Sequence, residues 1–486
     1  MDQSKAPVLD ALAAYHESRQ TPFTPPGHKQ GRGADPRVRA VLGEAVFRSD
    51  VLATSGLDDR TSSNGVLEEA QALMADAVGA DHAFFSTCGS SLSVKSAMLS
   101  VAGPHEKLLV GRDAHKSVVS GLILSGIRPV WVDPQWEAEL HLAHPPTAGA
   151  FEAAFAEHPD ARGALVTTPT PYGTCSDLAA IAEICHRRGR PLIVDEAWGA
   201  HLPFHPCLPT WAMDAGADVC VTSVHKMGSG LEQSSVFHLQ GDLIRPEVLK
   251  SREDLLGTTS PSSLVYAALD GWRRQMVEQG EALYDHALAL AQKTRERISR
   301  IDGMHVHGRD DFCGPGRAAD MDPLQIIIDI SAWEVTGYRA ADWLRDRHRI
   351  NLHVADHRRI SAQLTHADDS DTVEALLAAL TAAHAAELRT GQPVEVPPPS
   401  RLRLEQAVLP RDAFFGRTEQ VPWQEADGRV AAEMLTPYLP GIPAALPGER
   451  LTGDVLRYLR TGVQAGMVVP DAVDTEVTSV RVLREE

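Results

Sequence analysis

The stretch that decides the fold is residues 191–230, PLIVDEAWGAHLPFHPCLPTWAMDAGADVCVTSVHKMGSG. Its apolar runs at residues 192–194 and 219–221 predict two buried strands of a parallel sheet. Asp195 follows the first run directly, and Lys226 comes shortly after the second. Sheets of this kind bind ligands beyond the carboxyl ends of their strands. The stretch therefore predicts an α/β fold with an acid and a lysine at one edge of its sheet.

An acid and a lysine in these positions suit pyridoxal phosphate (PLP) chemistry. The Lys226 amine would hold the cofactor aldehyde as a Schiff base, and the Asp195 carboxylate would keep the pyridine nitrogen protonated, so that the ring accepts electrons from the substrate Cα. The alternative is that Asp195 caps the following helix and Lys226 is an ordinary solvated lysine. The apolar strands that precede both residues favour the cofactor interpretation.

The composition excludes several classes of protein. The chain has 486 residues, and its 46 Lys plus Arg against 65 Asp plus Glu give a formal net charge of −19, which argues against binding to nucleic-acid phosphates. No apolar signal core follows Met1 and no run is long enough for a membrane span, so we expect a cytoplasmic protein. Six scattered cysteines form no CxxC pair, and we expect them to be reduced: Cys88, Cys175, Cys185, Cys207, Cys220 and Cys313.

Changes in sequence texture predict five parts. They are an N-terminal segment (1–65), a large α/β domain (66–270), a small α+β domain (271–390), a proline-rich linker (391–404) and a C-terminal module (405–486). In the large domain the pattern predicts a mostly parallel sheet, with strands at 83–85, 107–110, 129–132, 164–167 and 192–194 and helices near 67–77, 115–125 and 177–188. In the small domain it predicts helices at 278–301, 338–348 and 372–388 and a strand at 324–328.

Two further segments end on the same predicted sheet edge. After the strand at 83–85, the turn with Gly89, Ser90 and Ser91 should open a helix, whose N–H groups and hydroxyls would suit the cofactor phosphate. After the strand at 107–110 comes His115, which we expect to stack on the pyridine ring. The alternatives are an ordinary serine N-cap for the turn and a helix-capping role for His115.

With these residues in place, the chain resembles the bacterial ornithine/lysine/arginine decarboxylases, PLP enzymes of fold type I, the aspartate aminotransferase-like fold. The resemblance rests on Asp-x-Ala-Trp-Gly at 195–199 and Ser-x-His-Lys at 223–226, and on a C-terminal Tyr-x-Pro-Gly-Ile-Pro at 438–443 followed by Pro-Gly-Glu at 447–449. Further matches are Pro-Gly-His-Lys at 26–29 and Leu57-Asp58-Asp59. The length of the chain resembles the short, biosynthetic type that is associated with polyamine formation.

The resemblance implies a role for each matching residue. Lys226 would bind the cofactor covalently, Asp195 would pair with the pyridine nitrogen and His115 would stack on the ring. Thr258 matches a residue that reaches the phosphate in the neighbouring subunit, which implies a homodimer or a tetramer. The remaining cofactor contacts would be Gly89, Ser90, Ser91, Ala197, Trp198, Ser223 and His225.

The substrate contacts that the resemblance implies are Glu433, Glu449 and His353. The family's C-terminal module supplies acids to the far end of the pocket, so the two glutamates would bind a basic side chain; as an alternative, both are surface carboxylates. His353 stands where related decarboxylases tend to have a glutamate, and Leu439 stands where the family usually has proline. The change at His353 puts the usual substrate in doubt, because the small domain can approach the active site in that region.

The expected activity is therefore decarboxylation of a basic L-amino acid, with arginine favoured over ornithine and lysine. A PLP enzyme of the same fold with another outcome, such as oxidative decarboxylation, deamination or transamination, remains an alternative. A non-catalytic regulator is a further alternative, which the presence of Lys226 and Asp195 disfavours. We expect no metal, because His201 and His205 are separated by proline and because His305 and His307 show no further partner in the sequence.

Overall fold

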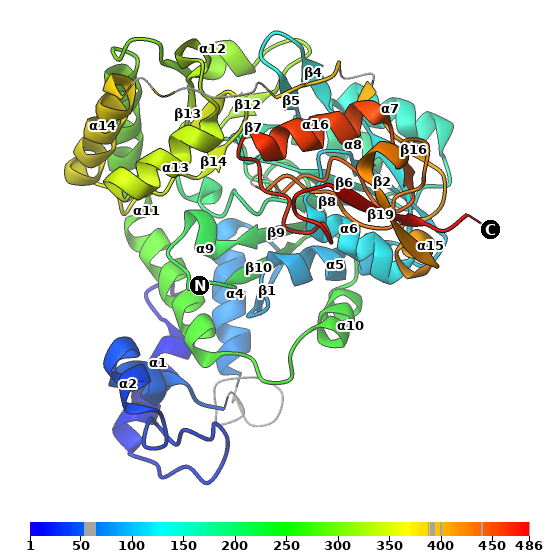
Figure 1. The fold of residues 1–486 in the computed structure, drawn as a ribbon. Coiled ribbons are helices and arrows are strands. Elements are labelled where there is room, and N and C mark those ends of the chain that lie inside the picture. Colours follow the sequence, from blue (N-terminus) through cyan, green and yellow to red (C-terminus); the bar gives the residue numbers. More distant parts are fainter. Residues whose placement is uncertain (53–64, 387, 389–393, 399–400, 439–440, 486) are drawn as a thin grey trace. The chain divides into compact units, whose positions relative to one another are not determined.

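The computed structural model describes residues 1–52, 65–386, 388, 394–398, 401–438 and 441–485 (Figure 1). The chain divides into two compact units, Met1–Val101 with Gly189–Leu283 and Ala102–Arg188 with Tyr284–Glu486. The predicted division into five parts stays a prediction. Several residues of predicted motifs lie outside the described residues: Leu57, Asp58, Asp59, Leu439, Pro440 and linker positions 391–393 and 399–400. The described linker residues 394–398 belong to no helix or strand, as their prolines predict.

The first unit builds four strands and the helices around them. Strands β1, β10, β9 and β8 follow one another in that order. The β8–β9 pair is parallel, whereas β10 runs antiparallel to both β1 and β9. The elements are α1 (Pro7–Ser18), α2 (Pro36–Leu42), α3 (Glu44–Ser49), α4 (Val66–Val78), β1 (His82–Ser86), α5 (Ser90–Val101), β8 (Leu192–Asp195), β9 (Val219–Ser223), α9 (Val224–Met227), β10 (Ser235–Leu239), α10 (Pro246–Leu256) and α11 (Ser263–Ile298), which continues into the second unit.

The apolar runs of this unit form the strands that the sequence predicts. Every residue of β8, β9 and β10 is buried, as expected for strands covered on both faces. The long helix was predicted to begin at Glu278, and this is wrong because α11 begins at Ser263. Gly271 and the buried charges of Asp270 and Arg273 interrupt the apolar pattern in its first part and hid the helix.

The N-terminal segment is fastened to α11 by a fully buried ion pair. Arg273 donates to Asp270 at 2.9 Å, and both side chains are 0% exposed. The Arg273 guanidinium also donates to the carbonyl oxygen of Gln3 at 2.7 Å and to that of Lys5. Asp270 in turn accepts the N–H of Val8 at 2.8 Å. A buried guanidinium needs several acceptors, and here the first residues of the chain supply two of them.

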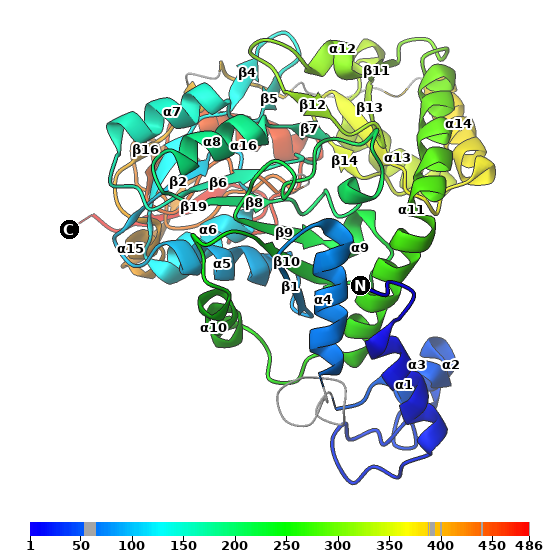
Figure 2. The ribbon, with the colours of Figure 1, turned by 180° about the vertical axis from the view of Figure 1, so that it is seen from behind.

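The second unit holds three strands in the order β6, β2, β3, with both pairings parallel. Figure 2 shows α7 and α8 side by side on this unit. The predicted strands at 107–110, 129–132 and 164–167 and the helices near 115–125 and 177–188 are confirmed. The elements of this part are β2 (Lys107–Gly111), α6 (Lys116–Ser125), β3 (Arg128–Val132), β4 (Gln135–Glu137), β5 (Leu142–His144), α7 (Ala148–Glu157), β6 (Ala164–Thr167), β7 (Thr174–Cys175) and α8 (Leu178–His186).

A second, antiparallel sheet of this unit has the order β11, β13, β15, β14. Helix α13 packs on β14, β15 and α14. The predicted helices at 338–348 and 372–388 and the predicted strand at 324–328 correspond to α13, α14 and β13. The elements are β11 (His305–His307), α12 (Arg309–Phe312), β12 (Asp320–Met321), β13 (Gln325–Asp329), α13 (Gly337–His348), β14 (Val354–Ala355), β15 (Arg359–Gln363) and α14 (Ser370–Ala385).

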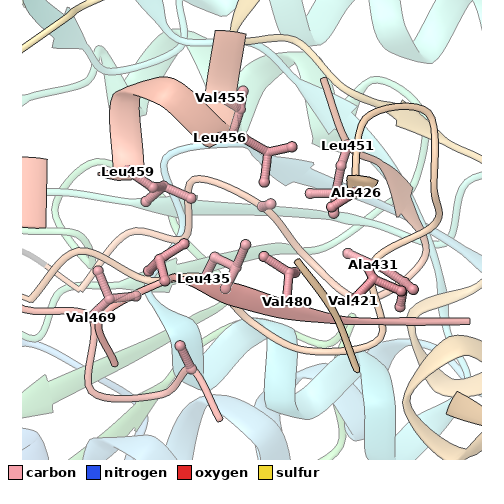
Figure 3. Packing of buried hydrophobic residues seen from close by; sticks show 14 of the residues in the cluster. Val421, Ala426, Ala431, Leu435, Leu451, Val455, Leu456, Leu459, Val469 and Val480 are labelled. Carbon is pink, nitrogen blue, oxygen red and sulfur yellow. The ribbon is translucent and has the colours of Figure 1, made fainter. Parts of the chain in front are cut away.

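The C-terminal part of the second unit has an apolar core of its own. Figure 3 shows Val455, Leu456 and Leu459 of α16 on one side of this core and Val480 of β19 on the other. Each of these four side chains is at most 1% exposed. The elements here are β16 (Glu405–Gln406), α15 (Pro410–Phe415), β17 (Thr418–Pro422), β18 (Glu449–Arg450), α16 (Gly453–Gln464) and β19 (Ser479–Leu483). Among the described residues, none of the helices combines the length and the apolar character that a membrane crossing needs.

A buried ion pair joins this C-terminal part to the loop after β2. Arg112 donates to both carboxylate oxygens of Glu449, at 3.2 and 3.0 Å, and Glu449 is 1% exposed. Burial raises the pKa of Glu449, while the charge and hydrogen bonds of Arg112 act in the opposite direction. The charge of Arg112 therefore offsets part of the cost of burying the Glu449 carboxylate.

We expect Arg112→Ala to destabilise the protein by about 3 kcal/mol at pH 8, because it leaves the Glu449 charge buried without a partner. The native pKa of Glu449 already lies above its ordinary value and would rise further in the variant. Its ionisation would then cost more stability as the pH rises, so the loss should be smaller at pH 5 than at pH 8. Urea denaturation at both pH values measures this. Adding Glu449→Gln should recover part of the loss at pH 8, and an equal loss at both pH values would contradict the explanation.

Candidate active site

The structure brings the predicted acid and lysine together. Asp195 ends β8 and is 3% exposed, and Lys226 lies in α9, which directly follows β9. The two strands are parallel with Asp195 opposite Val221, so both residues stand at the same end of the sheet. Burial raises the pKa of Asp195 and lowers that of Lys226 to about 8, and the opposite charge of each partner counteracts its shift. An amine with this pKa is partly neutral near pH 8 and can act as a nucleophile.

Trp198 and Ala197 complete the surroundings of this pair. The Lys226 Nζ atom lies 3.8 Å from the centroid of the Trp198 ring, a cation–π distance. The N–H of Ala197 donates to Asp195 Oδ1 at 3.3 Å and so orients the carboxylate. The predicted alternative, in which Lys226 is an ordinary solvated lysine, is wrong.

Glu196 is a buried acid that sequence reasoning passed over. It is 1% exposed, and burial raises its pKa well above the ordinary value. The Cys220 thiol donates to its Oε2 at 3.2 Å. The available signal was the position of Glu196 directly after Asp195, at the end of a strand. The sequence did not indicate whether the Glu196 side chain would be buried or exposed.

The predicted phosphate turn also forms. Gly89 has φ = +75°, which a glycine adopts without strain, and α5 begins at the next residue. The hydroxyl of Ser223 donates to that of Ser90 at 2.5 Å, so the ends of β1 and β9 meet at this turn. The N–H groups of a first helical turn have no partner within the helix and favour an anion. Ser91 is exposed, and His225 lies with Nδ1 at 3.3 Å from the Ser234 carbonyl oxygen.

His115 lies in the second unit, at the start of α6. Its Nδ1 accepts the N–H of Ser117 at 3.2 Å, so the histidine caps the helix. Capping was one of the two roles predicted for His115. The C-terminal motif packs against its ring, because a Cβ at Gly441 would lie 3.0 Å from His115 Cδ2. The Lys116 N–H also donates to the Gly441 carbonyl oxygen at 3.1 Å. Stacking of His115 on a cofactor ring stays a prediction.

The two glutamates predicted to bind substrate are buried rather than on the surface. Glu433 is 4% exposed and accepts the N–H groups of Val473 at 2.7 Å and Arg481 at 2.5 Å. Glu449 is held by Arg112, as described above. The alternative that both are surface carboxylates is therefore wrong. In this structure their oxygens bind the protein's own groups, and their contact with substrate stays a prediction.

His353 approaches the segment that follows β6. Its Nε2 lies 3.2 Å from the carbonyl oxygen of Pro171, and the Tyr172 hydroxyl donates to Asp356 at 2.9 Å. The loop before β15 thus contacts the 170–173 segment at a strand end. Thr258, the residue predicted to reach a neighbouring subunit, is exposed.

The structure corrects one statement about histidine pairs. His201 and His205 flank a 3₁₀ turn at Leu202–Phe204, so a regular helical pair does not form, as predicted. The expectation that His305 and His307 have no further partner is wrong, because the side chain of Asp311 lies next to both. A short helix turns the chain back after β11 and brings this carboxylate to the histidines.

Two family models match the sequence of this chain. The one described as Orn/Lys/Arg decarboxylase, major domain, matches residues 6–309, and the one for the C-terminal domain of the same enzymes matches residues 401–478. The chain belongs to the Orn/Lys/Arg decarboxylase family. The predicted family and the predicted type of enzyme, an amino-acid decarboxylase, are confirmed.

Relatives of this decarboxylase cover its whole length. An arginine decarboxylase from Halalkalibacterium halodurans is 37% identical over 486 residues, 99% of this chain and 98% of the relative. The crystal structure of the lysine decarboxylase LdcF from Francisella novicida matches with a TM-score of 0.83 and 21% identity, over 99% of this chain and 81% of that one. An alanine–glyoxylate aminotransferase from Nostoc sp. matches with a TM-score of 0.54 and 16% identity, over 70% of this chain and 91% of that one. The predicted α/β fold of type I is confirmed.

Proposed function

We propose that this decarboxylase converts L-arginine to agmatine and CO₂ with PLP as its cofactor. The observation that carries the proposal is the pair formed by the buried Asp195, at the end of β8, and the half-buried Lys226, just after the neighbouring parallel strand β9. Family membership supports a basic amino acid as substrate. The arginine decarboxylase that is 37% identical over almost the full chain supports arginine ahead of ornithine and lysine.

The residues of the first unit fit each end of PLP. A buried acid suits a protonated ring nitrogen, and a lysine whose pKa burial lowers to about 8 suits the aldehyde. The start of α5, with the paired hydroxyls of Ser90 and Ser223, suits the phosphate. When bound, the cofactor supplies an electron sink for the electron pair left at Cα when CO₂ departs.

The protein's own groups then have separate tasks. Lys226 would hold the cofactor covalently, give it up to the substrate amine and be placed to return a proton to Cα. Asp195 would hold the proton on the ring nitrogen. Its burial supports this role, because few water molecules can form hydrogen bonds to the carboxylate in place of the ring nitrogen. Trp198, against the Lys226 side chain, would limit the directions from which substrate approaches. His115 would stack on the cofactor ring, as the family resemblance implies.

Direct product analysis tests the proposal. PLP-loaded protein is incubated separately with L-arginine, L-ornithine and L-lysine, and CO₂, amine, ammonia and peroxide are measured. We expect CO₂ and agmatine in equal amounts from arginine, with much lower turnover of the other two. Putrescine or cadaverine as the main product would overturn the choice of substrate. Ammonia or peroxide in place of the simple amine would overturn the reaction itself.

Gly441→Ala tests whether His115 must hold its position. Gly441 has φ = +84°, and a Cβ there would lie 3.0 Å from His115 Cδ2, so the ring has to shift. The ring has to move by a few tenths of an ångström. Since a displacement of about 1 Å can reduce rates by about 10²-fold, we expect the smaller movement to lower kcat by about tenfold. Gly428→Ala is the matched control, because its φ is +79° and no atom lies within 4 Å of the added Cβ. Equal loss of kcat in both variants would mean that backbone strain alone is responsible.

We further propose that the enzyme is a homodimer with shared active sites. The exposure of Thr258 supports this, and so does the exposure of apolar side chains in the N-terminal segment, 93% for Phe23 and 83% for Val41. Thr258→Ala should weaken cofactor binding. If Thr258 acts on the neighbouring subunit, unfolding and refolding a mixture with Lys226→Ala should restore activity that neither variant has alone. No restoration, or a monomer in light scattering, would contradict the dimer.

A further inference from the structure

Strand β11 ends in a cluster of two histidines and one aspartate. His305 and His307 are two residues apart on this edge strand, with ring centroids 4.8 Å from each other. Gly308 ends the strand, and α12 brings Asp311 back so that its Oδ2 accepts the Gly308 N–H at 2.9 Å. Figure 2 shows α12 beside β11. Asp311 Oδ2 lies 3.1 Å from His305 Nε2 and 3.7 Å from His307 Nδ1.

The His307 nitrogen that faces this cluster lacks a hydrogen-bond partner. Its side chain is 2% exposed, and within the described part of the chain Nδ1 is a buried atom without a hydrogen bond. Phe312 stacks on the ring at a centroid distance of 4.6 Å and limits its rotation. A buried ring nitrogen without a partner is costly, so its position beside a carboxylate oxygen calls for a bridging group.

The opposite nitrogen of His307 faces a second carboxylate. Its Nε2 accepts the Nε–H of Arg359 at 3.5 Å and lies 3.6 Å from Asp329 Oδ2. Arg359 has Asp356 as its own ionic partner, at 3.2 Å. With Nε2 as the acceptor, the hydrogen of the neutral ring lies on Nδ1. Metal binding at Nδ1 would move this hydrogen to Nε2, where the Asp329 carboxylate can accept it. A carboxylate behind a histidine is the usual arrangement that orients a metal-binding imidazole.

The charges around the cluster leave room for a cation. The nearby cations have other partners, since Arg309 pairs with Asp320 and Arg317 with Glu137. His305 is 60% exposed, so the cluster is open to solvent on one side.

We propose that His305, His307 and Asp311 form a binding site for Zn²⁺ or a similar divalent ion, with water as the fourth ligand. The ligand atoms all lie within 4.8 Å of one another. In a tetrahedral zinc site with bonds of about 2.0–2.1 Å, neighbouring ligand atoms are about 3.3 Å apart, so the measured separations close onto an ion with small side-chain movements. Two imidazoles and one carboxylate favour zinc, copper or nickel over magnesium and calcium. The ion would fasten α12 to β11.

Zinc binding by the PLP-loaded enzyme tests this site. Protein without a histidine tag is treated with chelator and titrated with Zn²⁺ in equilibrium dialysis. We expect about one Zn²⁺ per chain for the wild type, and an affinity at least about tenfold lower for His305→Ala and for Asp311→Asn. His286→Ala, which removes an exposed histidine of α11, is the matched control and should bind like the wild type.

Two further readouts separate a zinc site from a change in folding. His305 is largely exposed and Asp311→Asn keeps the side-chain shape, so both variants should unfold at wild-type temperature without metal. Zn²⁺ should raise the unfolding temperature of the wild type and of His286→Ala but of neither site variant. Added Co²⁺ should give the visible absorption of tetrahedral coordination in the wild type but not in His305→Ala or Asp311→Asn. Wild-type affinity in both cluster variants, or no binding by the wild type, would overturn the proposal.

Discussion

Lys226→Ala is expected to lower kcat by about 10³-fold or more, because the substitution removes both the group that would hold the cofactor and the group placed to move the proton. The absorbance of the lysine-bound cofactor above 400 nm should disappear as well. Steady-state CO₂ release and the visible spectrum of the PLP-incubated protein measure the two effects.

Two variants make this result specific. Lys226→Arg keeps the positive charge beside Asp195 but cannot bind the aldehyde in the same way, so it should be as inactive as the alanine variant. Lys293→Ala removes an exposed lysine of α11 and should match the wild type. If Lys226→Ala kept its activity and its absorbance, another lysine would hold the cofactor and the central assignment would be wrong.

Asp195→Asn is expected to lower kcat by about 10²–10³-fold, since the amide has the shape of the carboxylate but lacks the charge that would stabilise a protonated ring nitrogen. The cofactor should still bind, because Lys226 and the Ser90–Ser223 turn are unchanged. Asp195→Glu, which keeps the charge and alters its reach, should retain more activity than the asparagine variant. Equal activity of wild type and Asp195→Asn would remove the carboxylate from the mechanism.

The same variant has a pH signature in the cofactor-free protein. Burial lowers the pKa of Lys226 to about 8, and the Asp195 charge counteracts this. Without that charge the pKa falls further, so the amine becomes neutral at lower pH. The midpoint of the pH dependence of cofactor uptake by the stripped protein should therefore shift to lower pH in Asp195→Asn. A midpoint shifted upwards would contradict the electrostatic coupling of the two residues.

Patterns of apolar residues were enough to predict most of the parallel strands and the acid–lysine pair. Both follow from local sequence, because an apolar run of four or five residues bounded by polar ones predicts a buried strand, and its end predicts the edge where ligands bind. The antiparallel strand β10 was not predicted. Its segment, Ser235–Leu239, is as fully buried as β8 and β9, which are parallel to each other, and the direction of a strand leaves no mark in its composition.

The hydrogen-bond partners of the acids were beyond the sequence. Glu433 and Glu449 were predicted as substrate ligands or as surface charges, whereas both are buried and bonded to groups of the second unit. No role was predicted for Asp113. It is 6% exposed, its oxygens have no hydrogen bond within the described residues, and burial raises its pKa to about 7. Contacts between distant segments decide all three cases.

The histidine–aspartate cluster shows the same limit on a shorter scale. The sequence His-Val-His-Gly-Arg-Asp-Asp at 305–311 contains all three ligands, but the chain must turn back at Gly308 before Asp311 meets the histidines. The alternating histidines of the strand can be recognised in the sequence. The sequence does not show that the four-residue helix α12 brings Asp311 back to them. A glycine after such a pair, followed three residues later by an acid, is the signal that could have indicated it.

The buried Arg273 has a practical consequence for preparing the enzyme. Its guanidinium donates to carbonyl oxygens of Gln3 and Lys5, so trimming the first few residues would leave a buried guanidinium that keeps Asp270 but loses these acceptors. Preparations shortened at that end, by design or by proteolysis during purification, should be poorly soluble and lose activity on storage. Affinity tags are therefore better placed at the other end, where Glu485 is 77% exposed.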